Sequence, residues 1–452
     1  MRERTLNAVQ VAILLVSTSC GIGFLLGTGE LAMHHGMAGS LYAIATAIGL
    51  TALALCARRL WTGGKSVWDW SDQLYGGAVR RSVALLSLIW MTGVLAAQIR
   101  GGSSILALTG LPRTPSLLLI DGLLIGLSLL RLSWLAAGFA ICMLGCSAIL
   151  VRSLFETHGL RVWLHAPAQF IAALQPIAPE NTVFTIASVV VMVICGADYQ
   201  QFVLTARAPV IARTGCLLAA ALVFVIGFLP ASAVIAASPT WHLEHVVDPV
   251  QIVPIVLMHT LSSYSVIATR CLIITVLVTT ALGAGCSILR AMSDATATFG
   301  PGSTIQPLWS RALPIALASF VAMRGQSLID MMVDLNTVYI AAVAPLLIFW
   351  RLRTPVSNAA ANVAMATGCG IALSCYLMRW MGMTAIPDAA PILFASPTST
   401  AIGLLLTRRS KTFASRRRWA THCLPFCRAN GSSNGQFSTS PAAPLSEGAN
   451  GD

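Results

Sequence analysis

The chain has 452 residues, of which 56% are hydrophobic and only 10% are charged, and its formal net charge is +12. A mean hydropathy of +0.78 is far too apolar for an ordinary soluble domain. Apolar stretches of about 20 residues, the length that spans a bilayer, recur along the chain, so a lone signal peptide is excluded. The basic residues lie mainly between these stretches and in the tail. We therefore expect a lipid bilayer, and no nucleic acid, as partner.

Apolar runs bounded by charged or turn residues predict an all-α membrane protein with about 12 transmembrane helices. The expected spans are 6–33, 38–57, 82–108, 115–132, 134–154, 182–204, 211–237, 263–291, 309–325, 328–350, 358–380 and 388–407.

The basic residues also predict the orientation. With the amino terminus inside, the inner loops and the tail carry about three times as many basic residues as the outer side, as cytoplasmic loops do. We therefore expect a multi-pass protein of the cytoplasmic (inner or plasma) membrane with both termini in the cytoplasm. Residues 1–407 form the expected transmembrane domain. Residues 408–452 are basic and then rich in Ser, Gly and Pro, a composition typical of a disordered cytoplasmic tail.

Two expected spans carry residues that disfavour a continuous helix. The first contains Gly21 and Gly23, followed by Glu30, and the sixth contains Gly196 followed by Asp198. Broken backbone is tolerated inside a membrane only where it lines a cavity or is buried in protein. Two broken helices five spans apart are typical of an inverted repeat of five helices, whose solute site lies between the breaks.

This pattern predicts one repeat over about 6–155, a second over about 182–350, and two extra helices over about 358–407. A simpler interpretation is that the glycines only allow close helix packing, and it explains Gly21 and Gly23 equally well. It does not explain the two acids, because carboxylates at membrane depth are costly and usually functional.

Short motifs around the second break resemble a known family. The stretch Gly196-Ala197-Asp198-Tyr199-Gln200-Gln201, with Ala212-Arg213-Thr214-Gly215 after it, is similar to the sixth core helix and following loop of the sodium:solute symporter family. The first span, from Gly23 to Gly36, resembles the first core helix of that family. The resemblance covers roughly residues 6–350. It implies the five-plus-five inverted-repeat core shared with the amino-acid transporter superfamily, and solute uptake coupled to sodium.

The resemblance also implies a sodium site. In the family, the ion lies between backbone carbonyls of the first core helix, here near Ser17 and Ser19, and a pair of hydroxyls in the eighth. Two registers are possible for this chain. The preferred one places Thr279 and Thr280 at the hydroxyl pair. The other aligns Ser287 with a later serine of the family and leaves Gly283 and Ala284 at the pair. Alternatively, the threonines only bond carbonyls of their own helix.

The hypothesis from the sequence is a symporter that takes up a small polar solute by alternating access, with no cofactor besides the coupling ion. The candidate solute-binding residues are Gly21, Gly23, Glu30, Asp198, Tyr199 and Gln200, and the candidate sodium ligands are Ser17, Ser19, Thr279, Thr280 and Ser287.

Two alternatives remain open. A proton could replace sodium, with Glu30 or Asp198 as its carrier, because a carboxyl group in hydrocarbon can exchange a proton. A non-transporting membrane sensor could use the same fold. An enzyme is not expected, since no Ser/His/Asp set or phosphate loop falls at membrane depth. The roles of Asp121 and Asp334, the solute and the oligomeric state are not predicted.

Overall fold

The computed structural model describes residues 4–129, 132–262, 265–296, 298–299, 306–324, 327–351, 356–381 and 395–409. These residues all lie in one compact unit, Met1–Arg409. The expected tail lies, from residue 410 onward, outside the described residues.

The described chain is helical, and its only bridge between extended segments pairs Leu6 with Ala206. Short 3-10 turns lie at Gly36–Ser40, Leu243–His245 and Pro249–Gln251. The α-helices are α1 (Ala8–Ser19), α2 (Ile22–His35), α3 (Leu41–Gly63), α4 (Val67–Tyr75), α5 (Gly77–Ala107), α6 (Arg113–Leu127), α7 (Leu132–Glu156), α8 (Leu160–Leu164), α9 (Ala166–Leu174), α10 (Pro179–Cys195), α11 (Ala197–Thr205), α12 (Pro209–Gly227), α13 (Leu229–Trp241), α14 (Ile252–Thr260), α15 (Val266–Thr296), α16 (Gln306–Ala322), α17 (Leu328–Arg351), α18 (Asn358–Trp380) and α19 (Ser396–Arg409).

Every span expected from the sequence overlaps one or more of these helices, so the all-α membrane fold is confirmed; residues 388–394 of the last span lie outside the described residues. By length and composition alone, six of the described helical stretches could each cross a membrane, and the bent pair α10–α11 makes a seventh. Large apolar side chains such as Leu118, Ile141 and Phe320 are exposed. Exposed apolar side chains on many helices are what a lipid solvent requires.

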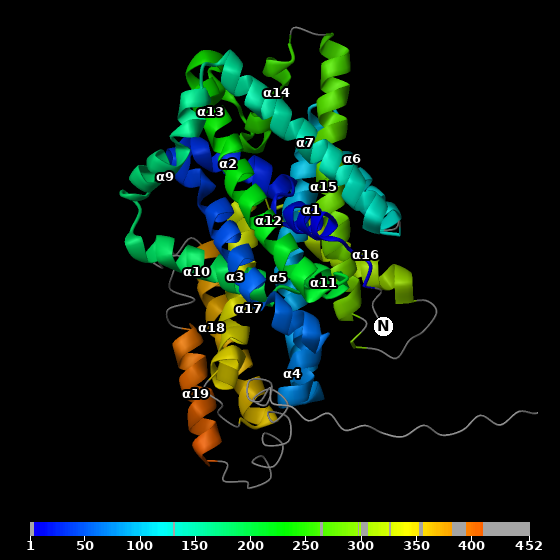
Figure 1. The fold of residues 1–452 in the computed structure, drawn as a ribbon, viewed down its shortest axis with the longest axis vertical. Helices are drawn as coiled ribbons and strands as arrows, with labels where there is room; N and C mark the ends of the chain where they lie inside the picture. The colour runs from blue at the N-terminus through cyan, green and yellow to red at the C-terminus, as the bar shows by residue number, and fades with distance from the viewer. Residues whose placement is uncertain are drawn as a thin grey trace, which may run out of the picture. The chain divides into compact units, whose positions relative to one another are not determined.

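Two helices pack against several of the others. Helix α5 contacts α15, α16 and α17, while α3 contacts α10 and α12. Figure 1 shows α4 at one end of this bundle, and α9, α13 and α14 at the opposite end. By the predicted orientation, the α4 end faces the cytoplasm. The segment 66–77 forms the short helix α4, whose Ser66 caps it and whose Tyr75 hydroxyl donates to the Leu346 carbonyl at 2.8 Å.

The first expected span is broken between α1 and α2, as the sequence predicts. The helical hydrogen bonds run up to the Cys20 amide, which donates to the Val16 carbonyl at 2.7 Å. Gly21 then leaves the helical conformation, with φ −59° and ψ 176°. Its carbonyl accepts from the Phe24 and Leu25 amides at 3.0 and 3.1 Å, which starts α2.

The sixth expected span is broken as well. Helices α10 and α11 meet at Gly196 with a bend of 44°. Pro179 lies in the first turn of α10, where its missing amide hydrogen costs nothing. The division into two repeats and two extra helices stays a prediction.

Candidate functional site

The break between α1 and α2 is filled by a side chain from α5. The Gly23 amide donates to Gln98 Oε1 at 3.4 Å, and Gln98 is only 2% exposed. This carboxamide supplies an acceptor to the start of α2, where backbone amides lack partners within their own helix. Sequence reasoning missed Gln98. Its one signal is that an amide side chain stands within an apolar span.

Both glycines of this break lie in close helix contacts. A Cβ atom on Gly21 would lie 2.7 Å from the Ala284 Cβ atom and 2.8 Å from Gln98 Oε1. A Cβ atom on Gly23 would lie 2.9 Å from the Ala97 Cβ atom. These contacts leave no room for a methyl group at either position. Close packing therefore accounts for the two glycines.

Helix α15 places a different turn beside the break than the preferred register requires. Ala284 lies against Gly21, and the Ser287 hydroxyl lies 3.4 Å from the Thr18 hydroxyl while it donates to the Ala284 carbonyl at 2.8 Å. Ser287 is thus the candidate ligand of α15 that reaches α1. The hydroxyl pair expected beside the break is replaced by the methyl group of Ala284.

The two threonines lie elsewhere, which corrects the expected placement. Thr279 and Thr280 lie beside Cys142 and Cys146 of α7. Their hydroxyls donate to carbonyls of their own helix, those of Thr275 at 2.7 Å and Val276 at 2.9 Å. Thr279 lies on a different face of α15 from Ala284, whereas Thr280 shares the face of Ala284 and Ser287 and lies one turn before Ala284.

The remaining cation candidates lie in the last turn of α1. Ser17 and Ser19 are both buried, and the Ser19 hydroxyl donates to the Leu15 carbonyl at 2.8 Å. Among the described residues, no three His, Cys, Asp or Glu side chains form a group that could hold a metal ion.

The second break frees two carbonyls at the end of α10, and side chains cover both. Gln200 Nε2 donates to the Ile194 carbonyl at 2.9 Å. The Tyr339 hydroxyl, from α17, donates to the Cys195 carbonyl at 3.2 Å. Gln200 therefore caps its own broken helix, and Tyr339 ties this helix to α17.

Asp198 lies in the first turn of α11 and is 1% exposed. Its oxygens lie close to the Asp198 and Tyr199 amides, yet neither oxygen has a hydrogen-bonded side chain among the described residues. The amino-terminal end of a helix favours a negative charge there. A buried carboxylate without a cation beside it is nevertheless costly, unless it is protonated or binds a cation.

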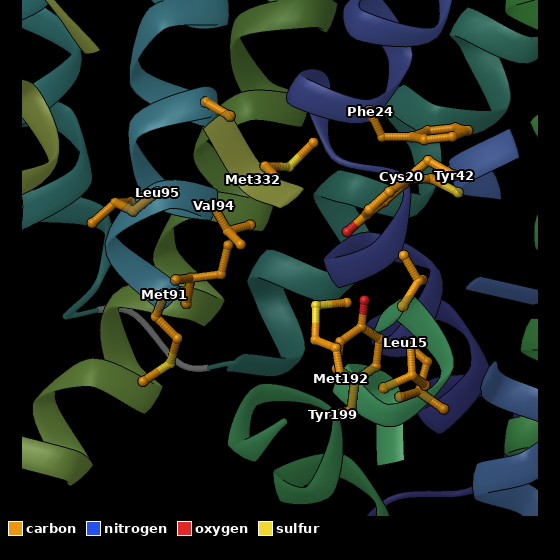
Figure 2. Close-up of a cluster of buried hydrophobic side chains, with 14 of the residues drawn as sticks. Leu15, Cys20, Phe24, Tyr42, Met91, Val94, Leu95, Met192, Tyr199 and Met332 are labelled. Carbon is orange, nitrogen blue, oxygen red and sulfur yellow. The ribbon is translucent and has the colours of Figure 1, made fainter. Parts of the chain in front are cut away.

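Three tyrosines lie near this carboxylate. Tyr42 of α3, Tyr199 of α11 and Tyr339 of α17 all interact electrostatically with Asp198. The Tyr199 side chain also lies close to Ser19 of α1, so α1 and α11 meet between the two breaks. Figure 2 shows Tyr42 beside Cys20 and Phe24, and Tyr199 beside Met192 and Leu15.

Glu30 does not join this cluster. Its Oε2 atom accepts from the Leu328 amide at 3.4 Å, at the start of α17, and Arg100, Asp248 and Asp330 interact with it electrostatically. The candidate solute residues are therefore divided between the two breaks and a separate charged cluster where α2 meets α17.

A cavity of about 270 Å³ lies among α2, α3, α10, α17 and α18. Asp330 and Asp334 line it on one side, and Tyr42, which also interacts with Asp198, lines it on another. Asp121, the other acid without a predicted role, accepts from the Ser319 hydroxyl at 2.7 Å and joins α6 to α16.

No protein-family model and no curated protein sequence matches the chain. Solved structures do. A Na+-coupled sialic acid symporter superposes with a TM-score of 0.69 at 13% identity, covering 90% of each chain. The fold of this chain is therefore that of the sialic acid symporter.

Other solved structures have the same fold. MHP1, a nucleobase-cation-symport-1 family transporter, matches with a TM-score of 0.55 at 14% identity, over 93% of this chain and 94% of its own. MhsT, solved in complex with L-phenylalanine, matches with a TM-score of 0.54 at 12% identity, over 90% of this chain and 100% of its own. Identities this low show the fold alone.

Proposed function

We propose that this protein is a secondary active transporter that moves a small polar solute by alternating access. The observation that carries the proposal is the meeting of two broken helices, α1–α2 and α10–α11, through Ser19 and Tyr199 inside the bundle. Half-helices that meet in this way offer free backbone groups to a solute and can tilt as units. Two of the proteins with the same fold are named as symporters, which supports the proposal.

We further propose that the coupling ion is a proton and not sodium. Sodium prefers several oxygen ligands, yet α15 presents the Ala284 methyl group to the break, and Thr279 and Thr280 lie against α7. Asp198, by contrast, is a buried carboxylate without a cationic partner among the described residues. A carboxyl group that gains and loses a proton as the helices tilt would couple the movement of protons to the movement of the solute. A sodium ion between Thr18 and Ser287 is the rival hypothesis.

Binding of radiolabelled polar solutes to the purified protein, with and without sodium, comes first. A solute that binds is then followed into liposomes that contain the protein. We expect uptake to continue when potassium replaces sodium at constant pH, and to accelerate when the outside is more acidic than the inside. Uptake that stops without sodium at every pH would favour the Thr18–Ser287 rival. Binding of a solute without its uptake into the liposomes would favour the alternative of a non-transporting membrane sensor.

The variant Asp198→Asn tests whether proton coupling can be lost while solute movement is kept. The amide cannot exchange a proton, so we expect uptake driven by a pH gradient to fall to the background level. Exchange of labelled for unlabelled solute, which needs no net proton movement, should persist. Asp121→Asn serves as the control, because Asp121 binds Ser319 away from both breaks. Gradient-driven uptake by Asp198→Asn at the normal rate would exclude Asp198 as the proton carrier.

We further propose that the protein lies in the cytoplasmic membrane with both termini in the cytoplasm. The argument is the excess of basic residues on the α4 side, among them Arg58, Arg59, Arg80 and Arg81. Alkaline phosphatase fused after residue 409 is expected to be inactive, and green fluorescent protein at the same position to be fluorescent. An active phosphatase fusion together with a non-fluorescent green fluorescent protein fusion would mean that the orientation is the reverse of the one proposed.

A further inference from the structure

We propose that an anionic phospholipid binds at the cytoplasmic ends of α3 and α12, with its phosphate group held by Arg58, Arg59 and Arg213. The site lies on the lipid-facing surface of the two helices. The inference goes beyond the proposed function and does not depend on transport. Only the choice of the inner leaflet rests on the proposed orientation.

Helices α3 and α12 lie side by side and run in opposite directions (Figure 1). Gly227, at the end of α12, packs against Ala43, near the start of α3. At the other end of the pair, Trp61 Nε1 of α3 donates to the carbonyl of Ala206, which precedes α12, at 2.8 Å. The two helices therefore stay in contact from one end to the other.

The arginines of the two helices lie at the same depth. Counted from the contact between Gly227 and Ala43, Arg213 is 14 residues back along α12 and Arg58 is 15 residues on along α3. At about 1.5 Å per residue, these separations are about 21 and about 22 Å along the two helix axes. Packed helices have axes about 8–10 Å apart, so the long side chains of Arg58 and Arg213 can reach a single phosphate group.

Exposed leucines lie beside the arginines on both helices. Leu55 lies three and four residues before Arg58 and Arg59, and Leu217 lies four residues after Arg213, so each leucine shares a helix face with its arginines. All five side chains are exposed. A phospholipid whose acyl chains lie along these leucines carries its phosphate at the level of the arginines, where membrane proteins place basic side chains.

The described residues leave the positive charges at this site without a counter-charge. Neither α3 nor α12 contains an acidic residue. The three arginines form no ion pair and no side-chain hydrogen bond among the described residues. The acids that follow α3 in the chain, Asp69 and Asp72 of α4, pair with Arg80 instead. Three free guanidinium groups on two adjacent helices therefore attract an anion.

The chemistry of the site favours a phospholipid over other anions. Guanidinium groups bind phosphate through paired hydrogen bonds, and basic sites between transmembrane helices attract anionic lipid head groups. A soluble phosphate or an acidic protein would use the charges but not the exposed leucines beside them. The chain's own tail is excluded as the occupant because it is basic as well, with Lys411, Arg416, Arg417 and Arg418.

The test compares phosphatidylglycerol, which is anionic, with phosphatidylcholine of the same acyl chains. Each lipid is titrated into the full-length protein in detergent, and the lipids bound to each protein molecule are counted by native mass spectrometry. We expect phosphatidylglycerol to bind at least about tenfold more tightly. Each of Arg58→Gln, Arg59→Gln and Arg213→Gln should weaken its binding about fivefold, which is the contribution of one basic residue beside an anionic lipid surface.

Arg161→Gln is the matched control, because Arg161 is an exposed arginine of α8, which packs against α9 and α13 at the opposite end of the bundle. It should leave the binding unchanged. All four variants alter exposed side chains, so each should melt like the unaltered protein in phosphatidylcholine. Equal binding of the two lipids, or the same affinity in the three site variants as in the control, would overturn the assignment. Displacement of phosphatidylglycerol by millimolar glycerol phosphate would indicate a site for a soluble phosphate and would also overturn it.

Discussion

Single atoms decide how close the two halves of the first broken span come to their neighbours. Gly21 has φ and ψ values that any residue can adopt, so its requirement is space and not backbone freedom. The hydrogen on its Cα atom lies where a methyl group would meet Ala284 and Gln98. This contact places the Gln98 carboxamide where it accepts from the Gly23 amide.

Gly21→Ala therefore tests the packing at the break. We expect it to lower the free energy of unfolding by about 1 to 3 kcal/mol, as overpacking does, and to slow solute uptake. Gly122→Ala is the matched control: Gly122 lies within α6 with no neighbour within 4 Å of an added Cβ atom. The control should be neutral or more stable by up to about 1 kcal/mol, because alanine favours a helix. Melting in the same detergent measures both, and equal shifts would contradict the packing argument.

Helix ends inside the bundle need partners from other helices. The end of α10 receives one from α17, through the Tyr339 hydroxyl on the Cys195 carbonyl at 3.2 Å. Another tyrosine makes the same kind of bond far from the breaks, where Tyr75 of α4 donates to the Leu346 carbonyl at 2.8 Å. The two bonds are chemically alike and differ only in which helices they join.

Tyr339→Phe and Tyr75→Phe form a matched pair. Each removes one hydroxyl and leaves a buried carbonyl, so each should cost about 1 to 3 kcal/mol of stability. Only Tyr339→Phe should also change the rate of uptake, because only Tyr339 holds a broken helix. Melting and uptake are measured on both variants. An equal effect of the two on uptake would mean that the bond to α10 has no special role.

Across the whole molecule, the amino-terminal segment ties the outer ends of the two broken helices together, at the side that we predict to be cytoplasmic. The Leu6 amide donates to the Thr205 carbonyl at 3.2 Å, and the Arg207 amide donates to the Leu6 carbonyl at 3.0 Å. Trp61 Nε1 donates to the Ala206 carbonyl at 2.8 Å, which adds the end of α3. These bonds join residues that precede α1 to the residues that follow α11. In alternating access they must break when this side opens.

Trp61→Phe removes one of these bonds and keeps an aromatic ring. We expect the amides of Leu6 and Arg207 to exchange with deuterium about fivefold faster or more, as the loss of about 1 kcal/mol implies. Arg152→Gln is the control, since its exposed pair with Glu156 within α7 contributes little. Unchanged exchange in Trp61→Phe would show that the bond does not hold this side closed.

The sequence by itself determined the lipid solvent, the helices and the two breaks. These features are local: apolar length and Gly21 or Gly196 act within a few residues of themselves. It also singled out Asp198, because an acid in an apolar run is visible without a fold. The sequence did not determine whether the coupling ion is sodium or a proton, nor which solute is moved.

Only the tertiary structure decided which helix faces meet. A shift of one turn along α15 separates Thr280 from Ala284, which lies against Gly21, and the spacing of hydroxyls in the sequence fits either register. Gln98 reaches Gly23 across 75 positions of the chain. Glu30 and Asp198 are both acids in apolar stretches of the sequence. They nevertheless lie in different places, because the helices that carry them pack against different segments. Helix positions follow from local patterns, whereas the face that each helix presents depends on packing against distant segments.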